Sequence, residues 1–316
     1  KQKTAYEIRL SLVGSEMCIR DSIHTALTRG GEQALAYYEA ALSLNRKMGN
    51  RRQEGTVLDG LGGLFCQSGR LQEAVLHYEA ALGIFRELGN PRSEGIARVN
   101  LGAVLLNQGR HADARVHTEA GLTRSREVGN PSSEAFALHC LGVLHEAEGR
   151  PREAREYFEQ AVAVYEEIDN RGGQSAAGRQ LGDLLCKEGQ QERAQTVYGR
   201  ALTAARHGGF SMYEGMILGS LGLLAARAGS HLEAAEAAAV GERLVRGAQA
   251  PPVLGELLQI KAEVDWLAGR AEAARAALAE SRALLPHLNP SDARVDALIA
   301  GAIPPEPQDR RSAPGR

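Results

Sequence analysis

The stretch of sequence that decides the fold is residues 61–110, which read LGGLFCQSGRLQEAVLHYEAALGIFRELGNPRSEGIARVNLGAVLLNQGR. It holds one pattern twice, forty residues apart: a Leu-Gly pair and, seven residues after that pair's glycine, a further glycine. The two copies are Leu61, Gly62 and Gly69, then Leu101, Gly102 and Gly109. Two copies in the same register indicate an internal repeat.

The repeat continues along the chain without an insertion. The Leu-Gly pair returns at 141–142, 181–182 and 221–222, and the later glycine returns as far as Gly269. An alanine keeps the same forty-residue period from Ala34 to Ala274. A period held over this length predicts an array of stacked supersecondary units.

Each repeat predicts two helices. Asn90 and Pro91 are typical of a helix start, because Asn caps free N–H groups and Pro at the first helical position lacks one. An apolar helical stripe follows and ends near Gly109, a residue type that suits the left-handed position closing a helix. A second stripe, from Ala74 to Phe85, predicts the next helix. We call these helix A and helix B of a repeat.

The small residues predict how the helices pack. The glycine of each Leu-Gly pair, and the alanine near the start of helix B, should let neighbouring helices approach closely. An aromatic residue four positions after that alanine should fill the space between repeats. These aromatic residues are Tyr38, Tyr78, Phe158 and Tyr198. A helical pair of this kind exposes apolar surface until further copies stack on it.

Leu-Gly, a glycine at the turn, then alanine, an aromatic residue and alanine resemble the tetratricopeptide repeat. The resemblance covers residues 23–285 and implies an all-α fold, a right-handed α-solenoid of helix-turn-helix units. Since the usual unit has about 34 residues, the chain resembles the long-repeat subtype of kinesin light chains, LGN-type G-protein regulators, and bacterial signalling ATPases and transcriptional activators. Departures from the family pattern are Leu58, Arg98, Leu138, Gly178 and Leu218 where Trp is common, Thr118 and Ala238 for the aromatic residue, and Lys261-Ala262 for Leu-Gly.

The two ends fall outside the array. Residues 1–22 do not join the forty-residue register and resemble a translated adapter scar, a non-native segment. The alternative is a genuine but divergent first helix. The array of 23–285 should then begin with a half repeat, followed by about six full repeats, which predicts a fragment of a longer protein. Residues 286–302 are expected to form a C-terminal cap, and the polar, Pro-rich residues 303–316 a disordered tail.

Composition limits the classes of partner. Lys and Arg number 37 against 39 Asp and Glu, a balance that offers no basic field for nucleic acid or anionic membranes. No apolar run reaches the ~18 residues of a membrane helix. The four cysteines form no CxxC pair and predict reduced, mostly buried thiols. These features predict a cytoplasmic protein.

No standard constellation of catalytic residues stands in the sequence, so we expect no enzyme, no cofactor and no metal. The Gly-rich GLGGLF at 60–65 lacks the Lys-Ser/Thr of a phosphate loop. His139, Cys140 and His145 suggest a metal site, yet residues six apart on a helix face different directions.

The resemblance implies a concave groove lined chiefly by helix A, where polar residues near the Leu-Gly pairs would meet a partner. The candidates are Asn100, Asn107, His139, Arg179, Gln180, Asp183, Lys187 and Arg227. Asparagine amides could clamp an extended peptide by donating and accepting at once, and the cations would favour acidic groups. The alternative, that many of these side chains are merely solvated, stays open.

The set of Lys and Asn residues with which some family members bind chaperone carboxylates is not evident. Its positions include Asp59, Gly60, Gly63, Val99 and Ala103. The sequence therefore predicts a protein–protein interaction scaffold that binds a peptide or partner domain, as the regulatory portion of a larger bacterial signalling or transcription-regulator protein. The alternative is a stand-alone adaptor of the LGN or kinesin-light-chain type, and an enzyme is the least favoured class.

Overall fold

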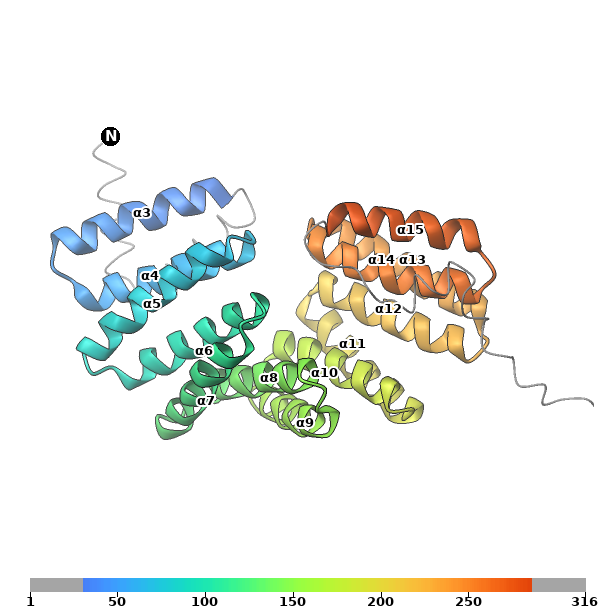
Figure 1. Cartoon of the computed structure of the whole chain (residues 1–316), viewed down its shortest axis with the longest axis horizontal. Helices are drawn as coiled ribbons and strands as arrows, with labels where there is room; N and C mark the ends of the chain where they lie inside the picture. The colour runs from blue at the N-terminus through green and yellow to red at the C-terminus, as the bar shows by residue number, and fades with distance from the viewer. Residues whose placement is uncertain (1–30, 286–316) are drawn as a thin grey trace, which may run out of the picture. The chain divides into compact units, whose positions relative to one another are not determined.

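A computed structural model describes residues 31–285, which are helical apart from short turns (Figure 1). The expected scar (1–22), the first residues of the array, the cap (286–302) and the tail (303–316) lie outside the described residues. The helices are α3 (Gly31–Lys47), α4 (Arg51–Gln67), α5 (Leu71–Glu87), α6 (Pro91–Asn107), α7 (His111–Glu127), α8 (Pro131–Ala147), α9 (Pro151–Glu167), α10 (Arg171–Lys187), α11 (Gln191–Gly208), α12 (Ser211–Arg227), α13 (His231–Gly247), α14 (Pro251–Leu267) and α15 (Ala271–Leu284).

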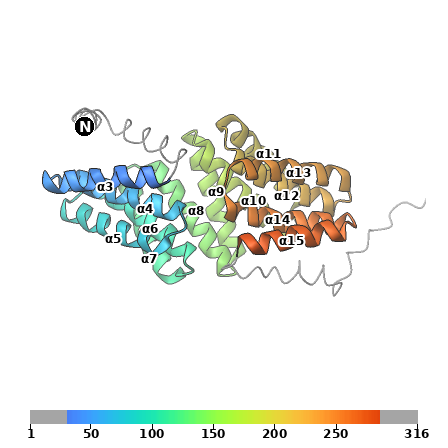
Figure 2. The same ribbon diagram turned by 90° about the horizontal axis from the view of Figure 1, so that it is seen from above.

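The helices gather in two compact units, one ending at Gly149 and the other beginning at Arg150. Among the described residues, unit 1 holds α3 to α8 and unit 2 holds α9 to α15. Even-numbered helices are the A helices of the repeat and odd-numbered helices are the B helices. Within a unit, consecutive helices pack side by side and run in opposite directions, as the two views show (Figure 1, Figure 2). The expected all-α repeat fold is confirmed.

The same short turn closes successive helices. Its left-handed residue is usually a glycine, such as Gly109 with φ of 72°, as the sequence predicted. The backbone N–H of the next residue, Arg110, then donates to the carbonyl of Leu105 at 2.9 Å. Asp169 and Gln249 hold the left-handed position at two turns, with φ of 49° and 53°.

Asparagine side chains cap the A helices α4, α6, α8 and α10. The Asn90 oxygen accepts a hydrogen bond from the backbone N–H of Ser93 at 3.2 Å, and Pro91 takes the first helical position. Asn50 and Asn130 cap α4 and α8 in the same way. Asn170 repeats the cap on α10. The turns before α4, α6 and α8 thus combine a left-handed glycine with an asparagine cap.

Close approach at the Leu-Gly pair sets the packing within a repeat. A Cβ added to Gly62 would lie 2.8 Å from the Tyr78 ring, so the ring occupies the space that the glycine leaves. Tyr78 therefore packs against helix A of its own repeat, whereas the sequence placed it between repeats. Tyr38 does reach the next repeat, because its ring lies over Gly60. Leu61, beside this glycine contact, is 1% exposed and belongs to the core of unit 1.

The A helices form one row in each unit. In unit 1, α4 contacts α6 and α6 contacts α8; in unit 2, α10 contacts α12 and α12 contacts α14. In residues 31–285 the backbones of successive B helices stay further apart, and long side chains bridge them, as Arg193 of α11 does to Glu159 of α9. Helices on the inner side of a curved stack lie closer together than those outside, so the A helices form the inner side of each unit.

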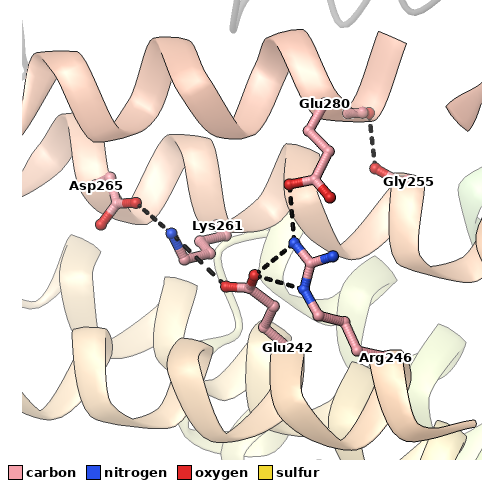
Figure 3. A network of polar contacts seen from close by, with 7 residues as sticks. Glu242, Arg246, Gly255, Lys261, Asp265 and Glu280 are labelled. Atoms are coloured by element: carbon pink, nitrogen blue, oxygen red, sulfur yellow. Dashed lines mark hydrogen bonds and ion pairs between the residues drawn. The ribbon is translucent and has the colours of Figure 1, made fainter. Parts of the chain in front are cut away.

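Polar contacts join α13, α14 and α15 at the place where the repeat pattern changes (Figure 3). Lys261 stands where other repeats have leucine, and its Nζ lies 2.9 Å from Asp265 and 3.8 Å from Glu242. Arg246 of α13 binds both Glu242 and, at 2.8 Å, Glu280 of α15. The substitution of leucine by lysine is thus matched by carboxylates on two helices.

Candidate functional site

Two of the predicted groove residues, Asn100 and Asn107, lie on the face of α6 that meets α4. The Asn100 amide donates to the Asp59 carboxylate, with Nδ2–Oδ1 and Nδ2–Oδ2 distances of 3.2 and 3.4 Å. Asn107 hydrogen-bonds to Cys66, two turns further along α4. Both pairs join residues forty-one positions apart, so this spacing marks the contact between successive A helices. The structure therefore brings these two asparagines onto one face.

Asp59 is the titratable centre of this face in unit 1. The carboxylate is half-buried; its burial raises the pKa to about 6, and the Asn100 hydrogen bond opposes the rise. Burial and the nearby Asp59 charge raise the pKa of Tyr38 on α3 to about 12. The same two causes raise the pKa of Tyr78 on α5 further. Asp59 thus sits among two neutral phenols and one amide.

No Lys or Arg side chain among residues 31–285 forms an ion pair with Asp59. The charged neighbours in sequence are committed elsewhere, since Glu54 binds Arg46 and Arg51, and Arg98 binds Glu94. When a carboxylate is ionised in a half-buried position and no cation pairs with it, its desolvation cost is not compensated. Asp59 is therefore the group on this face that a cationic partner would stabilise.

His139 lies on α8, half-buried, and its neighbours do not build a metal site. Cys140 is buried, which raises the pKa of its thiol to about 12. His145 is buried as well, with a guanidinium nitrogen of Arg115 at 3.5 Å from its Nε2. A cation in that position opposes metal binding. In the part of the chain that the structure describes, no three His, Cys, Asp or Glu side chains gather in a way that could hold a metal ion.

In unit 2, Arg179 and Asp183 form a closed cluster on α10. The guanidinium lies 2.7 Å from one carboxylate oxygen. The other oxygen accepts hydrogen bonds from the Tyr198 hydroxyl at 2.5 Å and from the Ser220 hydroxyl at 2.9 Å. Burial and the adjacent carboxylate raise the pKa of Tyr198, so it stays a donor. Both oxygens of the Asp183 carboxylate therefore have hydrogen-bond donors within the chain.

Arg179 also acts on the other A helices of unit 2. Its charge opposes the rise in pKa that burial causes for Tyr213 on α12 and for Glu256 on α14. In the row of A helices, α12 stands between α10 and α14.

The other cations predicted for the groove are Lys187 and Arg227. Arg227 of α12 binds Glu263 of α14 at 2.7 Å, and Glu263 is buried. Lys187 is exposed at the end of α10, and Gln180 is half-buried near the middle of that helix. Arg179 and Arg227 are thus neutralised by the chain's own carboxylates. The expectation that these cations favour an acidic ligand is weakened by this pairing.

The repeat register brings the two polar clusters into direct comparison. Positions 59, 63, 78 and 100 of unit 1 correspond to 179, 183, 198 and 220 of unit 2. Both clusters keep the tyrosine. Unit 2 pairs an arginine with an aspartate at the first two positions, whereas unit 1 has Asp59 and Gly63 there. A Cβ added at Gly63 would meet the Tyr78 hydroxyl at an ordinary 3.5 Å, so the place of the second charge is open in unit 1.

Several residues of these clusters were missed by sequence reasoning. They are Tyr38, Tyr78, Tyr198, Ser220 and Glu263, and Asp59 was noted solely as a mismatch to the chaperone-binding set. The usable signal is the forty-one-residue offset, which would have paired Asp59 with Asn100. The tyrosines were assigned to packing alone, and their hydroxyls were overlooked.

On the outer side of unit 2, a cavity of about 360 Å³ lies between α9 and α11 over α10. Its lining includes Val162, Leu181 and Gly178, the last at a position that is leucine in most other repeats. A Cβ added to Gly178 would lie 2.9 Å from the Cβ of Ala201, so α10 and α11 approach closely there. Two ion pairs, Arg193–Glu159 and Arg200–Glu166, join residues of the cavity lining.

None of the helices in residues 31–285 combines the length and the apolar character needed to cross a membrane. Burial raises the pKa of the three cysteines in this part of the chain, Cys66, Cys140 and Cys186. A thiol with a raised pKa is a poor nucleophile.

Three solved structures illustrate what the chain resembles. Aspartyl phosphate phosphatase F from Bacillus subtilis superposes with a TM-score of 0.66 at 14% identity, over 81% of this chain and 66% of that one. The Rap conjugation gene regulator of plasmid pLS20, in complex with the Phr* peptide, gives 0.67 at 17% identity, over 84% and 73%. A STAND signal-transduction ATPase with a tetratricopeptide repeat sensor, from Pyrococcus horikoshii, gives 0.59 at 12% identity, over 93% and 50%. At these identities the likeness shows the fold alone.

The chain spans just under two thirds of the phosphatase and half of the ATPase. A search of curated proteins by sequence found no match. The family model described as tetratricopeptide repeat matches residues 23–87 and 93–167. With the forty-residue register, the asparagine and glycine caps and the rows of A and B helices, this match shows that the chain carries tetratricopeptide repeats over residues 23–87 and 93–167.

Proposed function

We propose that the chain is a protein–protein interaction scaffold that holds a peptide or a partner domain against the A-helix face. The observation that carries the proposal is the polar lining of successive A helices. Asn100, Asn107 and Asp59 gather on the α4–α6 face, while the apolar side chains of the same helices point into the core. Amide and carboxylate groups held in fixed positions suit the backbone and side chains of an extended peptide.

The relatives in structure support this proposal. The Rap regulator was solved with the Phr* peptide bound, and the archaeal ATPase carries its tetratricopeptide repeats as a sensor. We therefore propose that this chain is the regulatory portion of a larger bacterial signalling or transcription-regulator protein that works in the cytoplasm. Nucleic acid and membrane are not among the proposed partners. The likeness to the phosphatase, at 14% identity, concerns the fold alone, and we propose no activity from it.

Selection from a random dodecapeptide display library against the full chain tests the scaffold. We expect peptides that bind with one-to-one stoichiometry in isothermal titration calorimetry. The variant Asn100→Ala should weaken their binding about tenfold, because it removes a bidentate contact between the amide and the peptide. It also removes the hydrogen bond by which Asp59 of α4 holds that amide.

The control variant is Arg152→Ala, which changes an exposed side chain on the B helix α9. It should leave the affinity unchanged. Selected peptides that respond to Arg152→Ala and ignore Asn100→Ala would place the binding surface on the outer side and refute the proposal.

A further inference from the structure

The acidic centre of unit 1 has a structure that goes beyond a generic polar face. Asp59 projects from α4 among side chains of three other helices: Tyr38 of α3, Tyr78 of α5 and Asn100 of α6. The only charge among these four side chains at neutral pH is the carboxylate. Its one hydrogen-bond donor in the described residues is the Asn100 amide.

A carboxylate has room for about four hydrogen bonds, so most of the acceptor capacity of Asp59 is unused within residues 31–285. The chain meets the same need elsewhere with its own cation. In unit 2 the carboxylate is Asp183, at the position of Gly63, and it pairs with Arg179, which stands at the position of Asp59. Tyr198 and Ser220 also donate to Asp183. In unit 1 Gly63, one helical turn beyond Asp59, leaves open the space next to the Tyr78 hydroxyl. Each cluster thus holds one carboxylate, at different positions of the repeat, and among the described residues unit 1 has no cation for its own.

We propose that Asp59, flanked by Tyr38, Tyr78 and Asn100, is a subsite for a guanidinium or ammonium group of a bound peptide. The arginine or lysine of the ligand would take the role that Arg179 has in unit 2. Arginine fits better than lysine, because a planar guanidinium can bind both oxygens of a carboxylate. This subsite rests on the proposed peptide-binding function and specifies the chemistry of the peptide.

Burial of the carboxylate gives the subsite a dependence on pH. The pKa of Asp59 is raised to about 6, and no other group of α3, α5 or α6 that faces it titrates near neutrality, since the partners are two phenols and an amide. Above pH 6 the carboxylate is ionised and binds the cation. As the pH falls through 6 it becomes protonated, and the affinity for an arginine-containing peptide decreases.

A small probe tests the subsite independently of any peptide. The Asp59 carboxyl carbon is titrated by ¹³C NMR in the full chain, alone and with N-acetyl-arginine amide. The subsite predicts that saturating arginine amide lowers the apparent pKa by about one unit, a tenfold preference for the ionised form. N-acetyl-citrulline amide, which has the same shape without the charge, should cause no shift. An equal shift with citrulline, or no shift with either compound, would overturn the subsite.

Affinities of selected peptides provide the second test. Peptides enriched on the chain at pH 7.5 should contain arginine, and Asp59→Asn should weaken their binding at least tenfold. The matched control is Asp113→Asn, which changes an exposed aspartate on α7 that pairs with Arg110 at 2.6 Å. Its affinity should equal that of the unaltered chain.

The two tests separate the subsite from the function on which it rests. Peptides that bind without any arginine or lysine, with affinities unchanged by Asp59→Asn, would refute the subsite and leave the scaffold standing. A shift with arginine amide but no selectable peptide would refute the scaffold and keep the cation site.

Discussion

At the scale of single residues, the chain is governed by positions where one residue type fits best. The left-handed residue at each turn is the clearest case. Gly109 was predicted from its type, because glycine takes a positive φ without steric cost. Gln249 occupies the same position with φ of 53° and gains no help from a short polar side chain.

Replacing Gln249 by glycine should therefore stabilise unit 2. We expect the free energy of unfolding to rise by about 0.5–1 kcal/mol, since the strain of a side chain at positive φ exceeds the entropy that glycine adds to the unfolded chain. Chemical denaturation measures the change. The reverse substitution, Gly229→Gln at φ of 86°, should destabilise by a similar amount, and a stable Gly229→Gln variant would contradict the account.

Asp59 should cost stability rather than provide it. Its folded-state pKa of about 6 lies above the ordinary value of 3.8, so the folded chain holds the proton more tightly than the unfolded chain. The protonated Asp59 carboxyl thus contributes fully to the free energy of unfolding below pH 4, and this contribution is lost as the pH rises through 6. At pH 8, Asp59→Asn should raise the free energy of unfolding by about 1–2 kcal/mol, reduced from the full linkage value because the side chain is half-exposed.

The pH profile of the same variant gives the stricter test. The gain from Asp59→Asn should shrink as the pH falls from 7 to 4, measured by urea denaturation at each pH. Asp113→Asn should show no such trend. A gain that is constant across this range would mean that the Asp59 pKa is not raised.

At the scale of elements, glycines inside the helices decide how closely the helices approach. Gly182 of α10 lies under the ring of Tyr198, and an added Cβ would overlap that ring. Gly199 of α11, by contrast, has open space where its Cβ would stand. The two glycines belong to neighbouring helices of one repeat, and Gly182 is buried whereas Gly199 is exposed.

Gly182→Ala should destabilise the chain by about 1–3 kcal/mol, because a buried ring cannot yield without shifting α11. Gly199→Ala should stabilise by about 0.5–1 kcal/mol through helix propensity. Thermal unfolding of both variants measures the difference. Similar effects of the two substitutions would show that the Leu-Gly position does not set the helix spacing.

The sequence predicts the elements better than their polar contacts. Asparagine caps, turn glycines and the forty-residue period gave the helices correctly, because those signals are local or strictly periodic. A second periodic feature was overlooked: an arginine near the end of helix B pairs with a glutamate eight residues later, at the start of the next helix A. These pairs are Arg46–Glu54, Arg86–Glu94, Arg126–Glu134 and Arg206–Glu214.

The polar face was predicted in part. Asn100, Asn107, Arg179, Asp183 and Arg227 do lie in contacts of the A row. Which cations are already neutralised could not be known, since Arg227–Glu263 depends on how one repeat stacks on the next. A single sequence shows the period of a repeat and not the side-chain geometry across its interfaces.

At the scale of the whole molecule, each repeat contacts its neighbours, so damage should stay local. Leu141 of α8 is 1% exposed. Leu141→Pro breaks the helix and its packing, and hydrogen exchange should then show loss of protection in α6 to α8 while α13 to α15 stay protected. A single sharp loss of protection over all helices would show that the array folds as one cooperative block.

The claim that the A-helix face binds a partner is tested most directly by a hydrogen–deuterium exchange footprint. The full chain is labelled alone and with one selected peptide at saturation. The account predicts slower exchange in α4 and α6 around Asp59 and Asn100, with the B helices α5 and α7 unchanged on their outer faces. Protection confined to the B helices would contradict the account and move the binding surface to the opposite side.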